Sequence, residues 1–157
     1  KIVITRPAVS VDEEYGFLPG TLLEKVAPWC RPVLDVFKEH YQPYQVEKML
    51  KDEIIELSPL SHMRGRTFKD SIMIFDESQS STANQMRMIL SRIGSGSRII
   101  ITGDTDQTER GFEDNGLRDF VSRLEKAGSD TMSIVKFSNS DIVRHPVIDE
   151  VLRLYKN

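Results

Sequence analysis

Short apolar runs rich in β-branched residues alternate along this chain with longer stretches that have the spacing of amphipathic helices. Apolar runs without polar alternation are typical of strands that are buried on both faces of a sheet. Strands that alternate with helices favour a parallel sheet with crossover connections, so the fold class predicted is α/β. The predicted strands are Ile2–Thr5, Ile54–Leu57, Ile72–Phe75, Ile99–Thr102 and Ile134–Phe137.

Helices are predicted in the stretches between these strands. Ser81 or Thr82 is expected to cap one of them, and Gly94 and Gly128 are suitable helix stops. The chain has no linker and no internal repeat, so residues 1–157 are expected to form one domain. The predicted helices are 21–41, interrupted around Pro28 and Pro32, then 44–51, 82–93, 116–127 and 147–155.

Composition excludes several classes of protein. The chain has 21 Lys and Arg against 24 Asp and Glu, so a uniformly basic nucleic-acid binder is excluded and any such site must be local. Its single cysteine, Cys30, has no partner for an internal disulfide. No apolar run approaches the roughly 20 residues that span a bilayer, so we expect an intracellular protein without a membrane partner.

The segment IMIFDE places two adjacent carboxylates, Asp76 and Glu77, directly after a predicted buried strand. In open α/β sheets ligands bind beyond the carboxyl ends of strands. P-loop nucleotidases hold magnesium beside a triphosphate with this pattern, in which Asp76 would orient the hydrated ion and Glu77 would polarise a water. The alternative is that Asp76 only caps the following helix, whose N-terminal end favours an acid.

A second predicted strand also ends in polar residues, in the segment IIITGDTDQ. Thr102, Gly103 and Asp104 follow this strand, and Gln107 lies three residues further on. An amide can donate to a phosphate oxygen and accept from a water, so Gln107 can sense a γ-phosphate. The alternative for Gly103 and Asp104 is an ordinary turn.

The segment HMRGRTFK is a local basic cluster that contains Arg64, Arg66 and Lys69. Guanidinium groups bind phosphates through two bonds, and Phe68 is expected to stack on a base. The phosphate can belong to ATP, to a single strand or to the nucleotide of a neighbouring subunit. The alternative is a solvated loop.

Several segments together resemble those of the PhoH-like ATPases, which are similar to the first RecA-like domain of superfamily 1 helicases. The resemblance covers nearly the whole chain, with the segments in family order. The segments are TRPAV (5–9), GFLPG (16–20), EKV (24–26), MRGRT (63–67), DESQ (76–79), TGDTDQ (102–107) and VRHP (143–146).

The resemblance implies a cytoplasmic protein that binds ATP and Mg²⁺ and hydrolyses ATP during the handling of single-stranded RNA or DNA. Asp76 would associate with magnesium through water, Glu77 would activate water, and Gln107 would sense the γ-phosphate. Arg144 would reach the developing phosphoryl charge, within one subunit or across the interface of a homo-oligomeric ring. Arg6 would contact nucleic acid or, alternatively, cover the end of the sheet. The expected nucleotide-binding set also contains Thr102, Gly103, Asp104, Arg64 and Arg66.

The phosphate-binding loop of this class, G-x-x-x-x-G-K-[ST], does not occur in the sequence. Gly111 and Gly116 have the spacing of its glycines, but Leu117 and Arg118 follow them, so a loop leading into a helix is expected there. In the resembled fold the strand that bears the loop would lie beside the strand ending in Asp76. We therefore expect a gap in the sheet at that place, a longer parent ATPase, and weak or absent turnover by this chain alone.

Two interpretations from other functional classes remain open. The chain can be a nucleic-acid-binding or assembly module that keeps the fold without turnover. It can also belong to a ribonuclease, although it lacks the dispersed acidic cluster that such an enzyme needs.

Overall fold

The computed structural model describes residues 1–7, 30–107, 115–138, 141, 143 and 146–154. The chain divides into two compact units, Lys1–Lys126 and Ala127–Asn157. The expectation that residues 1–157 form one domain stays a prediction.

The first unit is built on a four-stranded sheet in the order β2-β1-β3-β4, and all strand pairs are parallel. Ile4 at the centre of β1 lies opposite Leu57 of β2 and Ile74 of β3, and Ile74 lies opposite Ile100 of β4. The α/β prediction is confirmed. The strands are β1 (Ile2–Thr5), β2 (Ile55–Leu57), β3 (Ile72–Phe75) and β4 (Arg98–Ile101).

The position predicted for a gap in the sheet is wrong. Strand β3, which ends before Asp76, pairs with β1 on one side and with β4 on the other. Its backbone groups are therefore used on both edges, and no further strand can enter beside it. Within the described part of the chain the sheet ends at β2 and β4, so an additional strand can join only at those outer edges.

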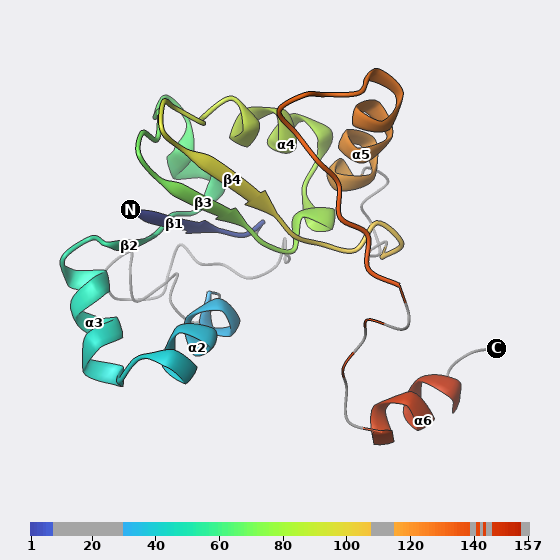
Figure 1. Ribbon diagram of the computed structural model, residues 1–157, viewed down its shortest axis with the longest axis horizontal. Helices are drawn as coiled ribbons and strands as arrows, with labels where there is room; N and C mark the ends of the chain where they lie inside the picture. The colour runs from blue at the N-terminus through green and yellow to red at the C-terminus, as the bar shows by residue number, and fades with distance from the viewer. Residues whose placement is uncertain (8–29, 108–114, 139–140, 142, 144–145, 155–157) are drawn as a thin grey trace. The chain divides into compact units, whose positions relative to one another are not determined.

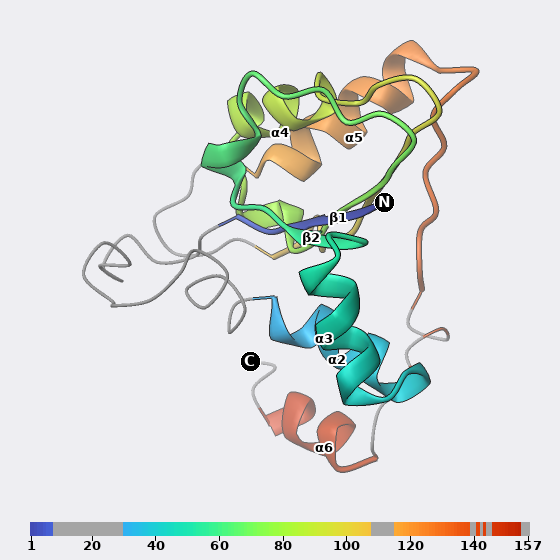
Figure 2. The same cartoon turned by 90° about the vertical axis from the view of Figure 1, so that its left-hand side faces the viewer.

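Helices cover both faces of the sheet in the first unit, as Figures 1 and 2 show. Side chains alternate between the faces along each strand, so Val3 joins the cluster under α4 and α5 while Ile4 joins the cluster under α2 and α3. The helices are α2 (Arg31–His40), α3 (Pro43–Lys51), α4 (Ala83–Leu90) and α5 (Gly116–Ala127), with short 3₁₀ turns η1 (Leu60–Met63) and η2 (Ser78–Ser80).

Helix α4 begins where the sequence predicts it. The hydroxyl of Thr82 accepts from the backbone N–H of Gln85, and the Gln85 side chain accepts in return from the backbone of Thr82. This reciprocal pair satisfies two backbone donors at the start of the helix. The helix ends at Leu90 rather than at Ile93, because Ile93 forms an isolated bridge with Phe68.

The second unit contains α6 (Pro146–Leu154), close to the predicted helix. The strand predicted at Ile134–Phe137 is absent, so that prediction is wrong. Val135 is 77% exposed and Phe137 is 83% exposed. An apolar run becomes a strand only when a neighbouring strand pairs with its backbone, and no other strand is described in this unit.

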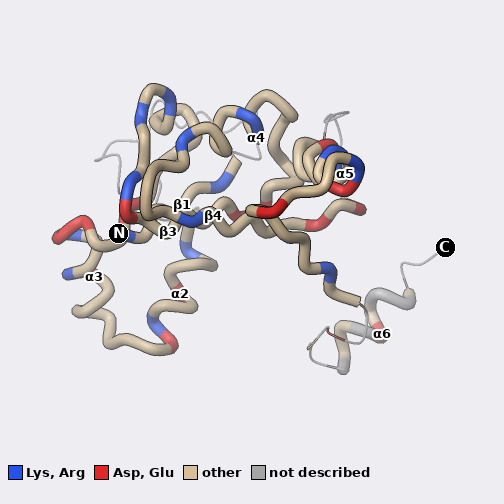
Figure 3. Tube along the Cα trace, turned by 45° about the horizontal axis from the view of Figure 1, so that its top comes forward, with Lys and Arg blue, Asp and Glu red and all other residues tan. Residues whose placement is uncertain are grey.

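Charged residues of both signs are interspersed over the first unit (Figure 3). This distribution agrees with the net charge of −3 and with the exclusion of a uniformly basic protein. In the described parts of the chain, no helix combines the length and the apolar character needed to cross a bilayer.

Candidate nucleotide site at the carboxyl edge of the sheet

The carboxyl ends of three parallel strands bring Arg6, Asp76 and Thr102 to the same edge of the sheet. The backbone N–H of Asp76 donates to the carbonyl of Thr5 at 3.0 Å, and the N–H of Thr102 donates to the carbonyl of Phe75 at 3.0 Å. The ladder therefore continues one residue past each strand. This edge is where open α/β sheets bind ligands.

Arg6 bridges the two carboxylates. Its Nε lies 3.4 Å from Oδ2 of Asp76, and its Nη2 lies 3.3 Å from Oε1 of Glu77. The Arg6 side chain is only 14% exposed, so its ion pairs with Asp76 and Glu77 are screened less by water than ion pairs on the surface. The positive charge explains how two adjacent acids are accommodated at the end of a buried strand. This role agrees with the alternative that Arg6 covers the sheet end.

Asp76 is fixed by a further bond, since the hydroxyl of Thr102 donates to its Oδ1 at 2.6 Å. The helix that follows is capped by Thr82, so the alternative in which Asp76 serves only as that cap is not what the structure shows. Asp76 instead lies between Arg6 and Thr102, with its side chain 23% exposed.

Glu77 has a strained backbone. Its φ of 51° and ψ of 39° are left-handed, a region that costs a residue with a side chain about 1–3 kcal/mol. Its carboxylate accepts from Nε2 of Gln79 at 2.5 Å, while the side chain remains 42% exposed. The acid is thus held at both oxygens, by Arg6 and by Gln79, and its side chain is still partly open to solvent, as a base that takes a proton from water must be.

The loop after β4 packs closely against the turn after β3. The carbonyl of Thr102 accepts from the backbone N–H of Ser78 at 3.0 Å and from its hydroxyl at 2.8 Å. A Cβ atom on Gly103 would lie 2.5 Å from Oε1 of Gln79 and 2.9 Å from Oγ of Ser78. Only glycine fits there without displacing these side chains.

The start of α5 holds the rest of this loop. Asn115 donates to the carbonyl of Gln107 at 3.1 Å, and Arg118 donates through Nε to the carbonyl of Thr105 at 2.8 Å. The backbone of Asp106 donates to Asp104 at 2.8 Å. Sequence reasoning missed Asn115 and Arg118, although it predicted correctly that a helix and not a phosphate loop begins at Gly116.

The site offers oxygen ligands of the type that Mg²⁺ prefers, from Asp76, Glu77 and Thr102. Magnesium needs only one or two carboxylates because it keeps most of its water, so this donor set fits. Among the described residues, no cluster of three or more His, Cys, Asp or Glu side chains forms a dedicated metal cage. Burial raises the pKa of the Cys30 thiol to about 11, which keeps it protonated and unsuited to metal binding.

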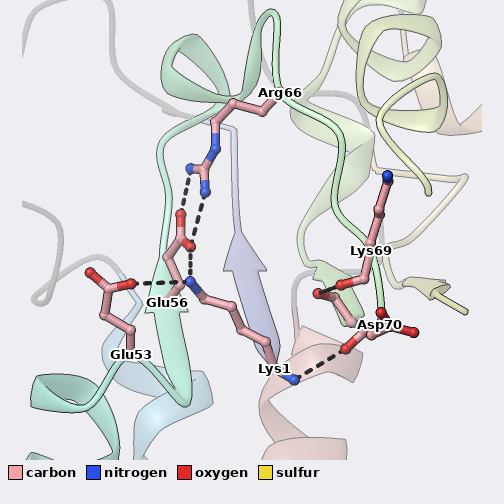
Figure 4. Close-up of polar contacts among 7 residues, drawn as sticks. Lys1, Glu53, Glu56, Arg66, Lys69 and Asp70 are labelled. Atoms are coloured by element: carbon pink, nitrogen blue, oxygen red, sulfur yellow. Dashed lines mark hydrogen bonds and ion pairs between the residues drawn. The ribbon is translucent and has the colours of Figure 1, made fainter. Parts of the chain in front are cut away.

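Arg66 binds Glu56 on the edge strand β2 (Figure 4). Nη1 and Nη2 of Arg66 lie 2.5 Å and 3.1 Å from the two oxygens of Glu56, and Nζ of Lys1 lies 2.8 Å from the same carboxylate. Phe68 is 5% exposed and lies under the Arg66 guanidinium at 4.5 Å, so the expectation that it stacks on a base is wrong. Arg64 is exposed at the end of η1.

Glu56 makes the stability of this region dependent on pH. Burial is the largest single influence and opposes ionisation, but the bonds from Arg66 and Lys1 together outweigh it and lower the pKa of Glu56. A depressed pKa contributes stability that is complete above the unfolded-state value of about 4.3 and is lost as the pH falls through the folded-state value.

We therefore expect Glu56→Gln to lower the free energy of unfolding at pH 7 by about 1–3 kcal/mol, since a charged hydrogen-bond acceptor is lost. The deficit should begin to shrink below the unfolded-state pKa of about 4.3 and should disappear as the pH falls through the lowered folded-state pKa. Urea unfolding at several pH values measures this. Glu53→Gln, on a side chain that is 78% exposed, is the control and should change little. A deficit that stays constant down to pH 3 would contradict this explanation.

The structure brings together five of the predicted residues, namely Asp76, Glu77, Thr102, Gly103 and Asp104, and places Gln107 beside them through Gln79. Gln79 was not predicted as a site residue, although an amide side chain two residues after Glu77 could have indicated it. Arg144 lies outside the described residues, as do parts of the TRPAV and VRHP segments and all of GFLPG and EKV.

Comparison with known proteins identifies the family. The model of the family described as "PhoH-like protein" matches residues 1–156. The chain is 41% identical over 156 residues to the PhoH-like protein of Mycobacterium tuberculosis (strain ATCC 25618 / H37Rv), covering 99% of this chain and 44% of that protein. It is 41% identical over 157 residues to the PhoH-like protein of Bacillus subtilis (strain 168), covering 99% and 48%.

Protein PhoH of Escherichia coli (strain K12) is 39% identical over 159 residues, which cover 99% of this chain and 44% of that protein. The chain thus spans somewhat less than half the length of these curated relatives. The match covers both sheet-end segments and confirms the resemblance seen in the sequence. The chain belongs to the PhoH-like protein family.

Proposed function

We propose that this chain is the part of an ATPase that carries its acidic catalytic residues, and that this ATPase hydrolyses ATP with magnesium. The observation that supports this most is the meeting of Asp76, Glu77 and Thr102 at the carboxyl edge of a parallel sheet, with Gln107 one side chain away. Helix capping does not require such an arrangement. Acids that hold the metal and activate water, together with an amide that orients the water, recur in enzymes that act on a metal-bound triphosphate.

In the proposed reaction each side chain has a separate task. Asp76, oriented by Thr102, would hold the metal through water. Bound magnesium supplies positive charge that neutralises the phosphate oxygens. Glu77 accepts the proton of the attacking water, and Gln107 orients that water or binds the terminal phosphate. Arg6 holds both carboxylates in register at the sheet edge.

A phosphate-binding loop is needed as well, and we propose that sequence outside these residues supplies it in the complete protein. The outer edge of β4 is a suitable place for its strand, because β3 is paired on both sides. Ile100 at the centre of β4 is 50% exposed, although its sequence is typical of a buried strand. A strand added at this edge would pair with the free backbone groups of β4, and its crossover helix would cover that side chain.

Single-stranded nucleic acid is the proposed partner of this ATPase. The ATPase is further proposed to be cytoplasmic and to form a homo-oligomer. The family resemblance supports this partner more than the geometry does, since Arg66 is bound to Glu56 and Phe68 is buried. A module that binds nucleic acid without turnover is the other candidate. Glu77→Gln would leave the function of such a module unchanged.

Turnover measured with and without magnesium tests the proposal. The complete protein that contains this chain should release phosphate from ATP with magnesium and should stop when EDTA removes the metal. The 157-residue chain alone should show weak or no turnover, because backbone N–H groups of a phosphate loop are lacking in its sequence. Absence of magnesium-dependent hydrolysis by the complete protein would refute the assignment.

A further inference from the structure

Gln79 is a buried polar side chain whose amide connects the two predicted strand-end segments. It lies in the turn η2 and is 4% exposed. Its Nε2 donates to Oε2 of Glu77 at 2.5 Å and to Oε1 of Gln107 at 3.4 Å. Its Oε1 accepts from the backbone N–H of Asp104 at 3.2 Å. One amide therefore contacts the proposed base, the proposed phosphate sensor and the loop between them.

The chemistry of these partners fixes the orientation of the amide. An ionised Glu77 carboxylate can only accept, whereas the backbone N–H of Asp104 can only donate. Turning the amide over would direct its oxygen at the Glu77 carboxylate and its NH₂ group at a donor. Both bonds would be lost in a buried place, where unpaired polar groups are costly. Gln79 therefore holds one orientation as long as the loop after β4 stays in place.

Contacts around Gln79 link its amide to the loop after β4, so the amide depends on the position of that loop. A Cβ atom at Gly103 would lie 2.5 Å from Oε1 of Gln79, so the loop backbone touches the amide directly. The carbonyl of Thr102 is held by Ser78, the residue before Gln79. A shift of the Asp104–Gln107 loop would move the amide, and the amide would in turn change the hydrogen bond that it donates to Glu77.

We propose that Gln79 is a positioning residue that couples the carboxylate of Glu77 to the γ-phosphate-sensing loop, so that the base is aligned only when Gln107 is in its working position. This inference rests on the proposed ATPase function. It makes Gln79 a residue that acts through Glu77 and Gln107 and does not itself touch the nucleotide.

Gln79→Glu in the complete protein is the sharpest test, because the two side chains have the same shape. Its second oxygen can still accept from the backbone of Asp104, but the donor to Glu77 is replaced by an acid. We expect kcat at neutral pH to fall at least about tenfold while KM for ATP changes by less than about twofold, the pattern of a defect confined to the transition state.

Two further variants keep the test decisive. Gln79→Met, of similar length but without an amide, should likewise lower kcat with little change in KM. If the Gln79 variants fail to fold, Gly103→Ala should produce the same split between kcat and KM by pressing on the amide. Gln42→Glu, an exposed site with the same change of charge, is the control and should leave both constants unchanged.

The outcomes separate the inference from the function on which it rests. Wild-type protein without magnesium-dependent turnover would refute the ATPase proposal. Active wild-type protein with Gln79→Glu and Gly103→Ala variants that keep kcat would overturn the positioning role alone. A rise in KM with unchanged kcat would also overturn it, because that result indicates ground-state binding.

Discussion

Replacing Glu77 by glutamine is expected to lower the rate of ATP hydrolysis by the complete protein by about 100- to 10,000-fold, the usual contribution of a general base. The amide is the same size as the acid but cannot take a proton from water. It can still accept from Gln79 at the contact that measures 2.5 Å in the wild type, so the turn should stay folded. Steady-state phosphate release measures kcat, and equilibrium binding of ATP should remain close to the wild-type value.

Glu39→Gln is a matched control, because this exposed acid lies on α2 and makes the same change of charge. It should leave hydrolysis unchanged. General acid–base catalysis supplies a larger factor than about threefold. If the Glu77→Gln protein hydrolyses ATP within about threefold of the wild-type rate, the base is therefore another residue.

Replacing Phe75 by alanine is expected to lower the free energy of unfolding by about 3–5 kcal/mol. Phe75 is fully buried at the end of β3 and belongs to the cluster under α4 and α5. Its loss leaves a cavity directly before Asp76. A loss of this size equals a large part of the 5–15 kcal/mol that typical domains possess. Urea unfolding followed by circular dichroism measures it.

Tyr44→Ala is the control for the loss of an aromatic ring, since Tyr44 is 68% exposed on α3. Its effect should lie within about 0.5 kcal/mol, as for other surface substitutions. A Phe75→Ala protein with the same unfolding midpoint as the Tyr44→Ala protein would show that β3 is not part of a packed core.

Local sequence patterns were enough to predict the parallel sheet and the polar strand ends. The run Ile72–Phe75 followed by Asp76 is informative because both faces of that strand are covered and its end lies at the ligand-binding edge. The cap at Thr82 could be predicted as well, since it depends on residues only three apart.

Features that depend on contacts between distant segments could not be predicted. Strand order is one of them, because the runs that pair with β3 are equally apolar in sequence and nothing local shows which lies beside it. The ion pairs from Arg6 to the two acids join residues about 70 positions apart. Charge patterns in a sequence predict ion pairs only between residues a few positions apart on a helix. Burial of Phe68 was missed because a basic segment is usually exposed, whereas Arg66 covers the ring here.

The central claim is that Asp76 and Glu77 are placed to act on a metal-bound triphosphate. Calorimetric titration of ATP into the complete protein, with and without magnesium, tests it most directly when the Asp76→Asn variant is measured beside the wild type. We expect magnesium to tighten ATP binding to the wild type and to have at least about tenfold less effect on the variant, because a carboxylate that orients the hydrated ion is lost. Equal strengthening by magnesium in both proteins, or no ATP binding by either, would contradict the account.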